Sequence, residues 1–147
     1  MSLPKIAVTM GDPAGIGPEI CLHLLQNKDL AKQCVPIIFG DRMVLEQAAE
    51  QCGLRKPTTY INGLTEAEGP CVLDLSAIPL SDFETGTINA ATGRAGYTYV
   101  EDAINAALSG QVAAFTVPVA KSFVVMAPRS NTQGPSASAK PSMYFVG

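Results

Sequence analysis

A short apolar segment that runs directly into a glycine- and proline-rich loop constrains the fold of this chain more than any other feature. Residues 5–10 are mostly apolar and include β-branched side chains, which is typical of a buried strand. Residues 11–19 contain three Gly and two Pro, a composition that indicates a shaped loop. Pro18 suits the first position of a helix and Glu19 its positive end, so a helix is predicted from Pro18 to about Leu25.

Strands and helices then alternate along the chain. Further strands are predicted at residues 35–40, 58–61, 71–75 and 113–117. Helices are predicted at residues 42–52, capped by Asp41 and closed by Gly53, and at residues 89–108. The apolar stripe of the helix at residues 89–108 includes Ala95, Val100, Ala103, Ala107 and Leu108. This order predicts an α/β fold, with a layered and mostly parallel sheet and flanking helices.

The last part of the chain has a different composition. Residues 1–127 are predicted to form the α/β domain, and residues 128–142, rich in Ser, Pro, Asn, Gln and Gly, an irregular segment. Residues 143–147 are again strand-like. An apolar strand with nothing after it to cover it is an aggregation hazard. The pattern therefore predicts that the chain is an incomplete piece of a larger fold.

Composition excludes several classes of protein. No long basic stretch occurs, and the four Tyr and five Phe do not alternate with Lys or Arg, so no nucleic-acid partner is expected. The apolar stretch near the start is too short for a signal peptide or a membrane span, which favours a cytoplasmic protein with no membrane partner. The four cysteines form no C-x-x-C pair and are expected to be free, buried thiols.

Two places could carry chemistry. Ligands of α/β sheets bind at the carboxyl ends of strands, so the loop after the first strand is a candidate active-site loop, through Gly11, Asp12, Pro13, Gly15 and Gly17. Lys121 follows the strand at 113–117 and could contact a phosphate or carboxylate as a point charge. The pattern of the loop fits a purely structural turn equally well. The position of Lys121 fits a solvated surface lysine equally well. Ile20 stands where a dinucleotide fingerprint needs its third glycine.

Three segments in this order resemble a known family. Residues 9–19, 86–96 and 115–121 are similar to motifs of the 4-hydroxythreonine-4-phosphate dehydrogenases of vitamin B6 biosynthesis. The resemblance implies a two-domain architecture like that of isocitrate and isopropylmalate dehydrogenases, of which the second half is absent here. It also implies oxidation of a small phosphorylated substrate, 4-phosphohydroxy-L-threonine, by NAD or NADP, followed by decarboxylation. A divalent metal (zinc, magnesium or cobalt) would assist, and the enzyme would be a homodimer.

The site residues carried over from the family are few. Lys121, Asn131 and Thr132 occupy the region of the family's substrate-binding lysine and Gly-His-Thr-Glu segments, with Asn131 where the family has His. The family's three metal-binding histidines lie beyond the end of this chain, whose only histidine is His23. No metal ligand is therefore expected here, and no catalytic residue is assigned.

Four alternatives stay open. The chain could belong to a related dehydrogenase that acts on phosphorylated threonate, or to one that acts on dihydrodiol dicarboxylates, since both share the opening motif. It could be an inactive fragment that keeps the fold without the catalysis. A generic nucleotide-binding module ranks last, because the glycine fingerprint is incomplete.

Overall fold

A computed structural model describes residues 2–119, 122–127 and 142–146, with the backbone alone from residue 118 onward. A seven-stranded sheet has the order β3-β4-β2-β1-β5-β6-β7. Its strands are β1 (Lys5–Thr9), β2 (Val35–Gly40), β3 (Tyr60–Ile61), β4 (Cys71–Asp74), β5 (Ala114–Val119), β6 (Ser122–Ala127) and β7 (Ser142–Val146). Three helices, α1 (Gly17–Leu25), α2 (Arg42–Cys52) and α3 (Ala90–Leu108), accompany them. The predicted α/β class is confirmed.

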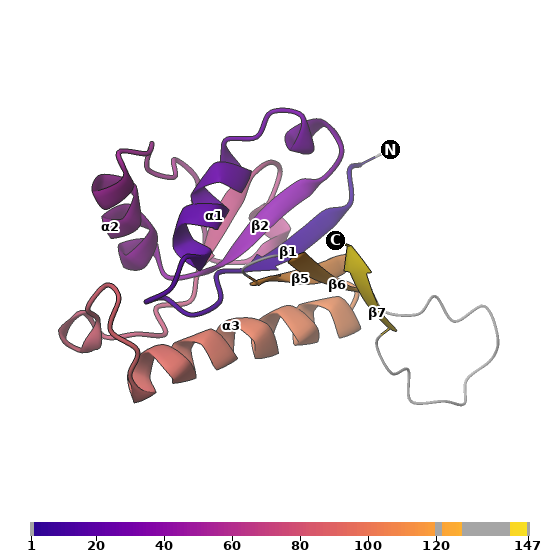
Figure 1. Ribbon diagram of the computed structural model, residues 1–147. Helices are drawn as coiled ribbons and strands as arrows, with labels where there is room; N and C mark the ends of the chain where they lie inside the picture. Colours follow the sequence, from indigo (N-terminus) through magenta and orange to yellow (C-terminus); the bar gives the residue numbers. More distant parts are fainter. Residues whose placement is uncertain (1, 120–121, 128–141, 147) are drawn as a thin grey trace.

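The five strands on the β3 side of the sheet are parallel, and β1 is the middle strand of the seven-stranded sheet. β1 pairs with β2 from Lys5↔Val35 to Thr9↔Phe39, and with β5 from Ile6↔Ala114 to Val8↔Thr116. The helices lie on both faces of the sheet, α1 and α2 on one and α3 on the other (Figure 1). Because both faces are covered, central strands must be apolar along their whole length, and all six residues of β2 are buried.

The antiparallel end of the sheet was not predicted. β6 pairs antiparallel with β5, and β7 pairs antiparallel with β6. β7 lies where the sequence is strand-like, and it forms the edge of the sheet opposite β3. The predicted irregular segment, residues 128–142, lies outside the described residues except for Ser142.

The buried face of α3 differs from the predicted stripe. Ala95, Ala103 and Ala107 are buried as predicted, but Val100 is only half-buried and Leu108 is 58% exposed. The face that packs on the sheet instead includes Tyr99, which is fully buried. Small alanines allow the helix to pack closely on the sheet, and the ring of Tyr99, at the middle of the helix, fills part of the core beside them. Reading apolar side chains alone missed this residue, because tyrosine has a polar end.

The cysteines are free, but not all are buried. Cys21 and Cys71 lie in the core, whereas Cys34 is half-buried and Cys52, the last residue of α2, is exposed. The prediction of four buried thiols was therefore wrong for Cys52. Among the helices of the described part of the chain, none combines the length and the apolar character that crossing a membrane requires.

Candidate functional site

The loop of residues 11–19 leaves the carboxyl end of the central strand β1 and turns into α1. Gly11 has a φ of +72°, which suits a residue without a Cβ. The Asp12 side chain accepts a hydrogen bond of 2.9 Å from the N–H of Ala14, and the Asp12 carbonyl accepts one of 3.0 Å from the N–H of Gly15. These bonds within the loop fix its shape without help from a ligand.

Two glycines set how closely the helices approach this loop. A Cβ on Gly17 would lie 1.9 Å from the carbonyl oxygen of Met10, so α1 can begin against the end of β1 only with glycine there. A Cβ on Gly96, in α3, would lie 3.3 Å from the carbonyl oxygen of Gly11. The loop is therefore held between the start of α1 and the middle of α3. The cost of a glycine inside a helix singles out Gly93 and Gly96 alike in the sequence, but only Gly96 has such a close contact.

The segment of residues 83–87, just before α3, completes the surroundings of the loop. The N–H of Gly86 donates to the carbonyl of Ala14 over 3.2 Å. Thr85 accepts hydrogen bonds of 3.3 Å from the side-chain amides of Gln47 and Gln51 on α2. Between this segment, the loop and α2 lies a small pocket of about 140 Å³, lined in part by Pro13, Ile16, Phe83 and Cys52. The motif at residues 86–96 thus meets the motif at residues 9–19 in space.

Three carboxylates lie at or just beyond the ends of β1, β2 and β4 at this edge, and each accepts hydrogen bonds from backbone N–H groups. Asp12 binds within its own loop, as above. Asp74 accepts from the N–H groups of Arg42 (3.2 Å) and Ser76 (3.1 Å). Asp41 is 2% exposed and accepts bonds of 2.8 Å from both Ala77 and Ile78. All three therefore shape the loops at the carboxyl edge.

The predicted capping role of Asp41 needs a correction. Asp41 is the N-cap residue of α2, but its side chain makes no capping hydrogen bond. The carboxylate turns away to the segment after β4, where two N–H groups, one of them on the buried residue Ile78, would otherwise lack partners. Asp74, from the neighbouring strand, binds the first N–H of α2 instead. Gly53 closes the helix as predicted, with a left-handed φ of +65°.

Tyr99 brings a buried hydroxyl to the same edge. Burial of the ring raises the pKa of the Tyr99 phenol, and the negative charge of Asp41 raises it further. No acceptor or donor in the described part of the chain meets hydrogen-bond geometry with this hydroxyl. At neutral pH the phenol is therefore protonated and acts as part of the core.

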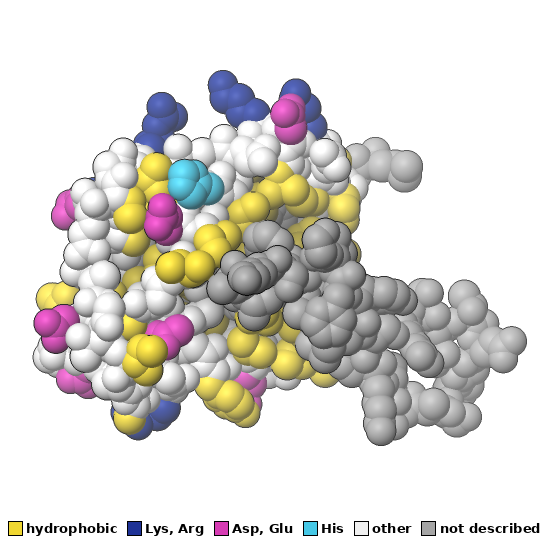
Figure 2. All heavy atoms as spheres, in the orientation of Figure 1, with side chains coloured by type: hydrophobic (Ala, Val, Ile, Leu, Met, Phe, Trp, Pro, Cys, Tyr) yellow, Lys and Arg dark blue, Asp and Glu magenta, His cyan; other side chains and the backbone are white. Residues whose placement is uncertain are grey.

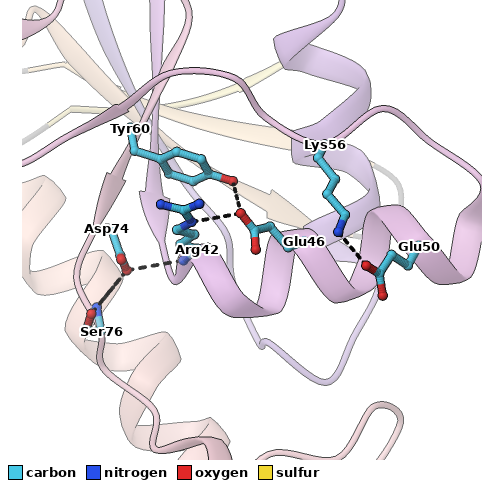
Figure 3. Close-up of polar contacts among 7 residues, drawn as sticks. All are labelled: Arg42, Glu46, Glu50, Lys56, Tyr60, Asp74 and Ser76. Carbon is cyan, nitrogen blue, oxygen red and sulfur yellow. Dashed lines mark hydrogen bonds and ion pairs between the residues drawn. The ribbon is translucent and has the colours of Figure 1, made fainter.

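A polar cluster covers the outer side of α2 (Figure 3). The guanidinium of Arg42 stacks 4.3 Å from the ring centre of Tyr60 and donates to Glu46 over 2.8 Å. The Tyr60 hydroxyl donates to the same carboxylate over 3.1 Å. The hydrogen bond from Arg42 is the main cause that lowers the pKa of Glu46. Lys56 pairs with Glu50 one turn further along. These side chains satisfy one another, so this cluster joins α2 to β3.

The predicted site residues fall into two groups. Gly11, Asp12, Pro13, Gly15 and Gly17 lie together in the loop at the carboxyl edge of the sheet. Lys121, Asn131 and Thr132 lie outside the described residues. β5, which precedes Lys121 in the chain, is hydrogen-bonded to β1.

The described residues do not form a metal site. Within residues 2–119, 122–127 and 142–146, no group of three His, Cys, Asp or Glu side chains is placed to hold an ion. Asp12, Asp41 and Asp74 also have oxygens committed to backbone N–H groups. The described residues thus do not fit a metal. A dinucleotide turn is not formed either, because α1 continues through Ile20 in place of the third glycine.

Comparison with known proteins gives the family. The model of the family described as pyridoxal phosphate biosynthetic protein PdxA matches residues 32–134. A 4-hydroxythreonine-4-phosphate dehydrogenase from Trichlorobacter lovleyi is 34% identical over 126 residues, which is 80% of this chain and 37% of that protein. A Symbiobacterium thermophilum protein, provisionally named a D-threonate 4-phosphate dehydrogenase, is 34% identical over 119 residues, which is 77% of this chain and 35% of that protein.

A solved structure agrees with these sequences. The crystal structure of a 4-hydroxythreonine-4-phosphate dehydrogenase from Burkholderia phymatum superposes with a TM-score of 0.69 at 32% identity, over 80% of this chain and 38% of that one. The chain thus spans little more than a third of the length of the relatives it matches. The matching family model and the shared fold together establish that the chain belongs to the PdxA family of pyridoxal phosphate biosynthetic proteins.

Proposed function

We propose that this chain supplies one wall of the substrate site of a 4-hydroxythreonine-4-phosphate dehydrogenase. The observation that carries the proposal is the 11–19 loop, which is shaped by its own hydrogen bonds and held between α1 and α3 at the carboxyl edge of the sheet. This edge is where α/β enzymes bind their ligands. The relative from Trichlorobacter lovleyi carries this activity in its name.

The small pocket beside the loop supports the view that this chain forms only one wall of the substrate site. Its volume of about 140 Å³ is smaller than the roughly 300–1,000 Å³ typical of small-molecule pockets. The first N–H groups of α1, at Gly17 and Glu19, have no partner within the helix and favour an anionic group nearby. The loop would thus orient a phosphate or carboxylate, while other parts of the enzyme enclose the substrate.

The proposed reaction oxidises the secondary alcohol of 4-phosphohydroxy-L-threonine. A hydride passes from the carbinol carbon to NAD or NADP, the hydroxyl proton leaves, and the resulting β-keto acid loses carbon dioxide. The residues described here form neither a metal site nor a dinucleotide turn, so no step is assigned to a group held by them. NAD or NADP and a zinc, magnesium or cobalt ion remain proposed cofactors of the whole enzyme, and Lys121, Asn131 and Thr132 proposed substrate contacts.

We also propose that the whole enzyme is a cytoplasmic homodimer. Ile88 and Tyr97, near the start of α3, are 77% and 68% exposed, and burying such side chains favours association. Light scattering on the purified protein tests this: a mass near twice that of the subunit supports the dimer, and a monomer at micromolar concentration rejects it.

The activity test combines the intact mass of the natural protein with reduction of NAD and NADP by 4-phosphohydroxy-L-threonine in the presence of a divalent metal. Turnover by a protein with a mass greater than 15.4 kDa supports the proposed dehydrogenase activity, with this sequence as one part of the enzyme. A natural protein of 15.4 kDa without turnover means that the chain is an inactive fragment and rejects the proposal.

A second substrate has one observation in its favour, the provisional name of the Symbiobacterium thermophilum relative. D-threonate 4-phosphate is therefore assayed beside 4-phosphohydroxy-L-threonine under the same conditions. A higher kcat/KM for D-threonate 4-phosphate assigns the chain to the threonate branch of the family and rejects the vitamin B6 assignment.

A further inference from the structure

A second pocket opens at the opposite edge of the sheet from the 11–19 loop. Its volume is about 390 Å³, and its lining includes Thr59, Cys71 and Leu25. Thr59 directly precedes β3, and Cys71 is the first residue of β4. Because β3 and β4 run parallel, both strands begin here, and Leu25 is the last residue of α1. The pocket therefore lies at the amino-terminal edge, away from the proposed substrate site.

The floor of this pocket is apolar. Leu22 and Cys71 are each 1% exposed and Leu25 is half-buried, while Pro57 and Pro70 contribute to the walls. The Gln26 side-chain amide donates to the carbonyl of Arg55 over 3.3 Å, which ties the loop after α2 to the end of α1. The N–H of Val72 donates to the carbonyl of Thr59 over 3.0 Å and holds the other side. The walls are thus joined by hydrogen bonds.

The rim of the pocket is positively charged. Three cations line it, Lys28, Arg55 and Lys56, and none of its lining residues is Asp or Glu. Lys56 is paired with Glu50, but neither Lys28 nor Arg55 takes part in an ion pair within the described part of the chain. Figure 2 shows Lys and Arg side chains standing along the upper margin of the molecule. A cation just after a helix, such as Lys28, is common, but Arg55 and Lys56 come from a different segment.

We propose that this pocket binds a small organic anion, a phosphate- or carboxylate-bearing molecule with a short apolar body. Its volume lies within the range of small-molecule sites. The guanidinium of Arg55 can bind an oxyanion with two parallel hydrogen bonds, and Lys28 adds a point charge. The hydroxyls of Thr58 and Thr59, which also line the pocket, supply neutral donors. Leu22, Leu25 and the two prolines face the apolar body. This site is independent of the proposed dehydrogenase activity.

The test is a titration of the ¹⁵N-labelled 147-residue chain with phenyl phosphate, followed through the amide resonances. The expected result is a saturable shift confined to residues 26–28, 55–56, 58–59 and 71–72, with a Kd of about 1 mM or below. Inorganic phosphate and benzoate are titrated in parallel. Weaker binding of inorganic phosphate shows that the apolar floor contributes, and comparison with benzoate decides between phosphate and carboxylate as the anionic group.

Matched charge reversals decide whether the pocket itself binds. Arg55→Glu is expected to weaken phenyl phosphate binding at least tenfold. Lys32→Glu makes the same change in net charge at an exposed lysine that does not line the pocket and pairs with Asp29; binding should change less than twofold. Equal weakening by both variants would mean diffuse attraction to a basic surface and would overturn the proposal. Absence of a saturable shift with all three anions up to about 20 mM would overturn it as well.

Discussion

The buried carboxylate of Asp41, at the end of β2, accepts a hydrogen bond of 2.8 Å from the N–H of Ile78, in the segment that follows β4. Its other oxygen binds the N–H of Ala77 at the same distance. One side chain thus joins the ends of two neighbouring parallel strands at the edge that carries the proposed substrate loop. Ser76, just before these two residues, has a φ of +46°, a conformation that needs such support.

Replacing Asp41 should therefore destabilise the fold. In Asp41→Ala, two N–H groups, one of them on a buried residue, lose their acceptors, which should cost about 2–3 kcal/mol of unfolding free energy. Urea denaturation measures the change. The control is Asp74→Ala, because Asp74 is only half-buried and water can replace it. A loss for Asp41→Ala no larger than for Asp74→Ala would contradict the assigned role.

The glycines of the 11–19 loop should differ in their tolerance of alanine. Gly17→Ala places a Cβ against the Met10 carbonyl, so the start of α1 must shift, at a cost of about 3 kcal/mol or more. Gly15→Ala meets its first neighbour, the carbonyl oxygen of Asp12, only at 3.4 Å and should cost less than about 1 kcal/mol. Thermal denaturation of both variants checks this, and similar midpoints would rule out the close contact at Gly17.

A third glycine should behave in the opposite way. Gly93 lies in the first turns of α3, and a Cβ there would meet nothing within 4 Å. Gly93→Ala should therefore stabilise the chain by about 0.5–1 kcal/mol, because alanine loses less backbone entropy in a helix. The measurement is again the midpoint of thermal unfolding. A lower midpoint would show that the open space above Gly93 belongs to a contact with another molecule.

The Glu46 cluster gives a pH dependence. The pKa of Glu46 is lowered in the folded chain, first by its hydrogen bond from Arg42, so its stabilising contribution is present above the unfolded pKa of about 4.3. That contribution is lost as the pH falls through the lower, folded pKa. Glu46→Gln should thus cost about 0.3–0.5 kcal/mol at neutral pH and almost nothing in acid. Urea denaturation at both pH values tests it; a difference that grows toward low pH would contradict the assignment.

The four thiols should react at very different rates. Burial raises the pKa of Cys21 to about 12 and that of Cys71 to about 11, so both remain protonated near the usual thiol pKa of about 8.5. Cys52 is exposed and should react first with a maleimide in the folded chain. Mass spectrometry of the peptides identifies the labelled residue. Fast labelling of Cys21 or Cys71 would mean that the core opens readily, and denaturant should make all four react.

The sequence was a good guide to the central part of the fold. Strands such as β2 are continuous apolar runs because both faces of a parallel sheet are covered, and such runs are visible without a structure. The ends of α2 were also predicted, since Arg42 follows a capping-type residue and Gly53 adopts a left-handed conformation. The antiparallel strands β6 and β7 were harder, because whether a short apolar segment pairs as a strand depends on the rest of the sheet.

The candidate site divides in the same way. Residues 11–19 could be recognised as a shaped loop because proline restricts the backbone and glycine frees it. These effects are local and can be predicted from the sequence. The contact of Gly96 with Gly11 and the hydrogen bond from Gly86 to Ala14 join residues far apart in the chain. Their spacing carries no trace of these contacts, apart from the cost of a glycine inside a helix.

By itself, the sequence determined the α/β class, the strand–loop–helix unit around residues 5–25 and the family motifs, because each depends on the periodicity and backbone preferences of neighbouring residues. Only the tertiary structure decided that the Asp41 side chain accepts hydrogen bonds from the segment after β4 and does not cap its own helix, and that Tyr99 lies in the core. It also brought Lys28 and Arg55 from separate segments to one pocket. A side chain can interact with several possible partners, and the packing of the fold determines which of them lies close enough.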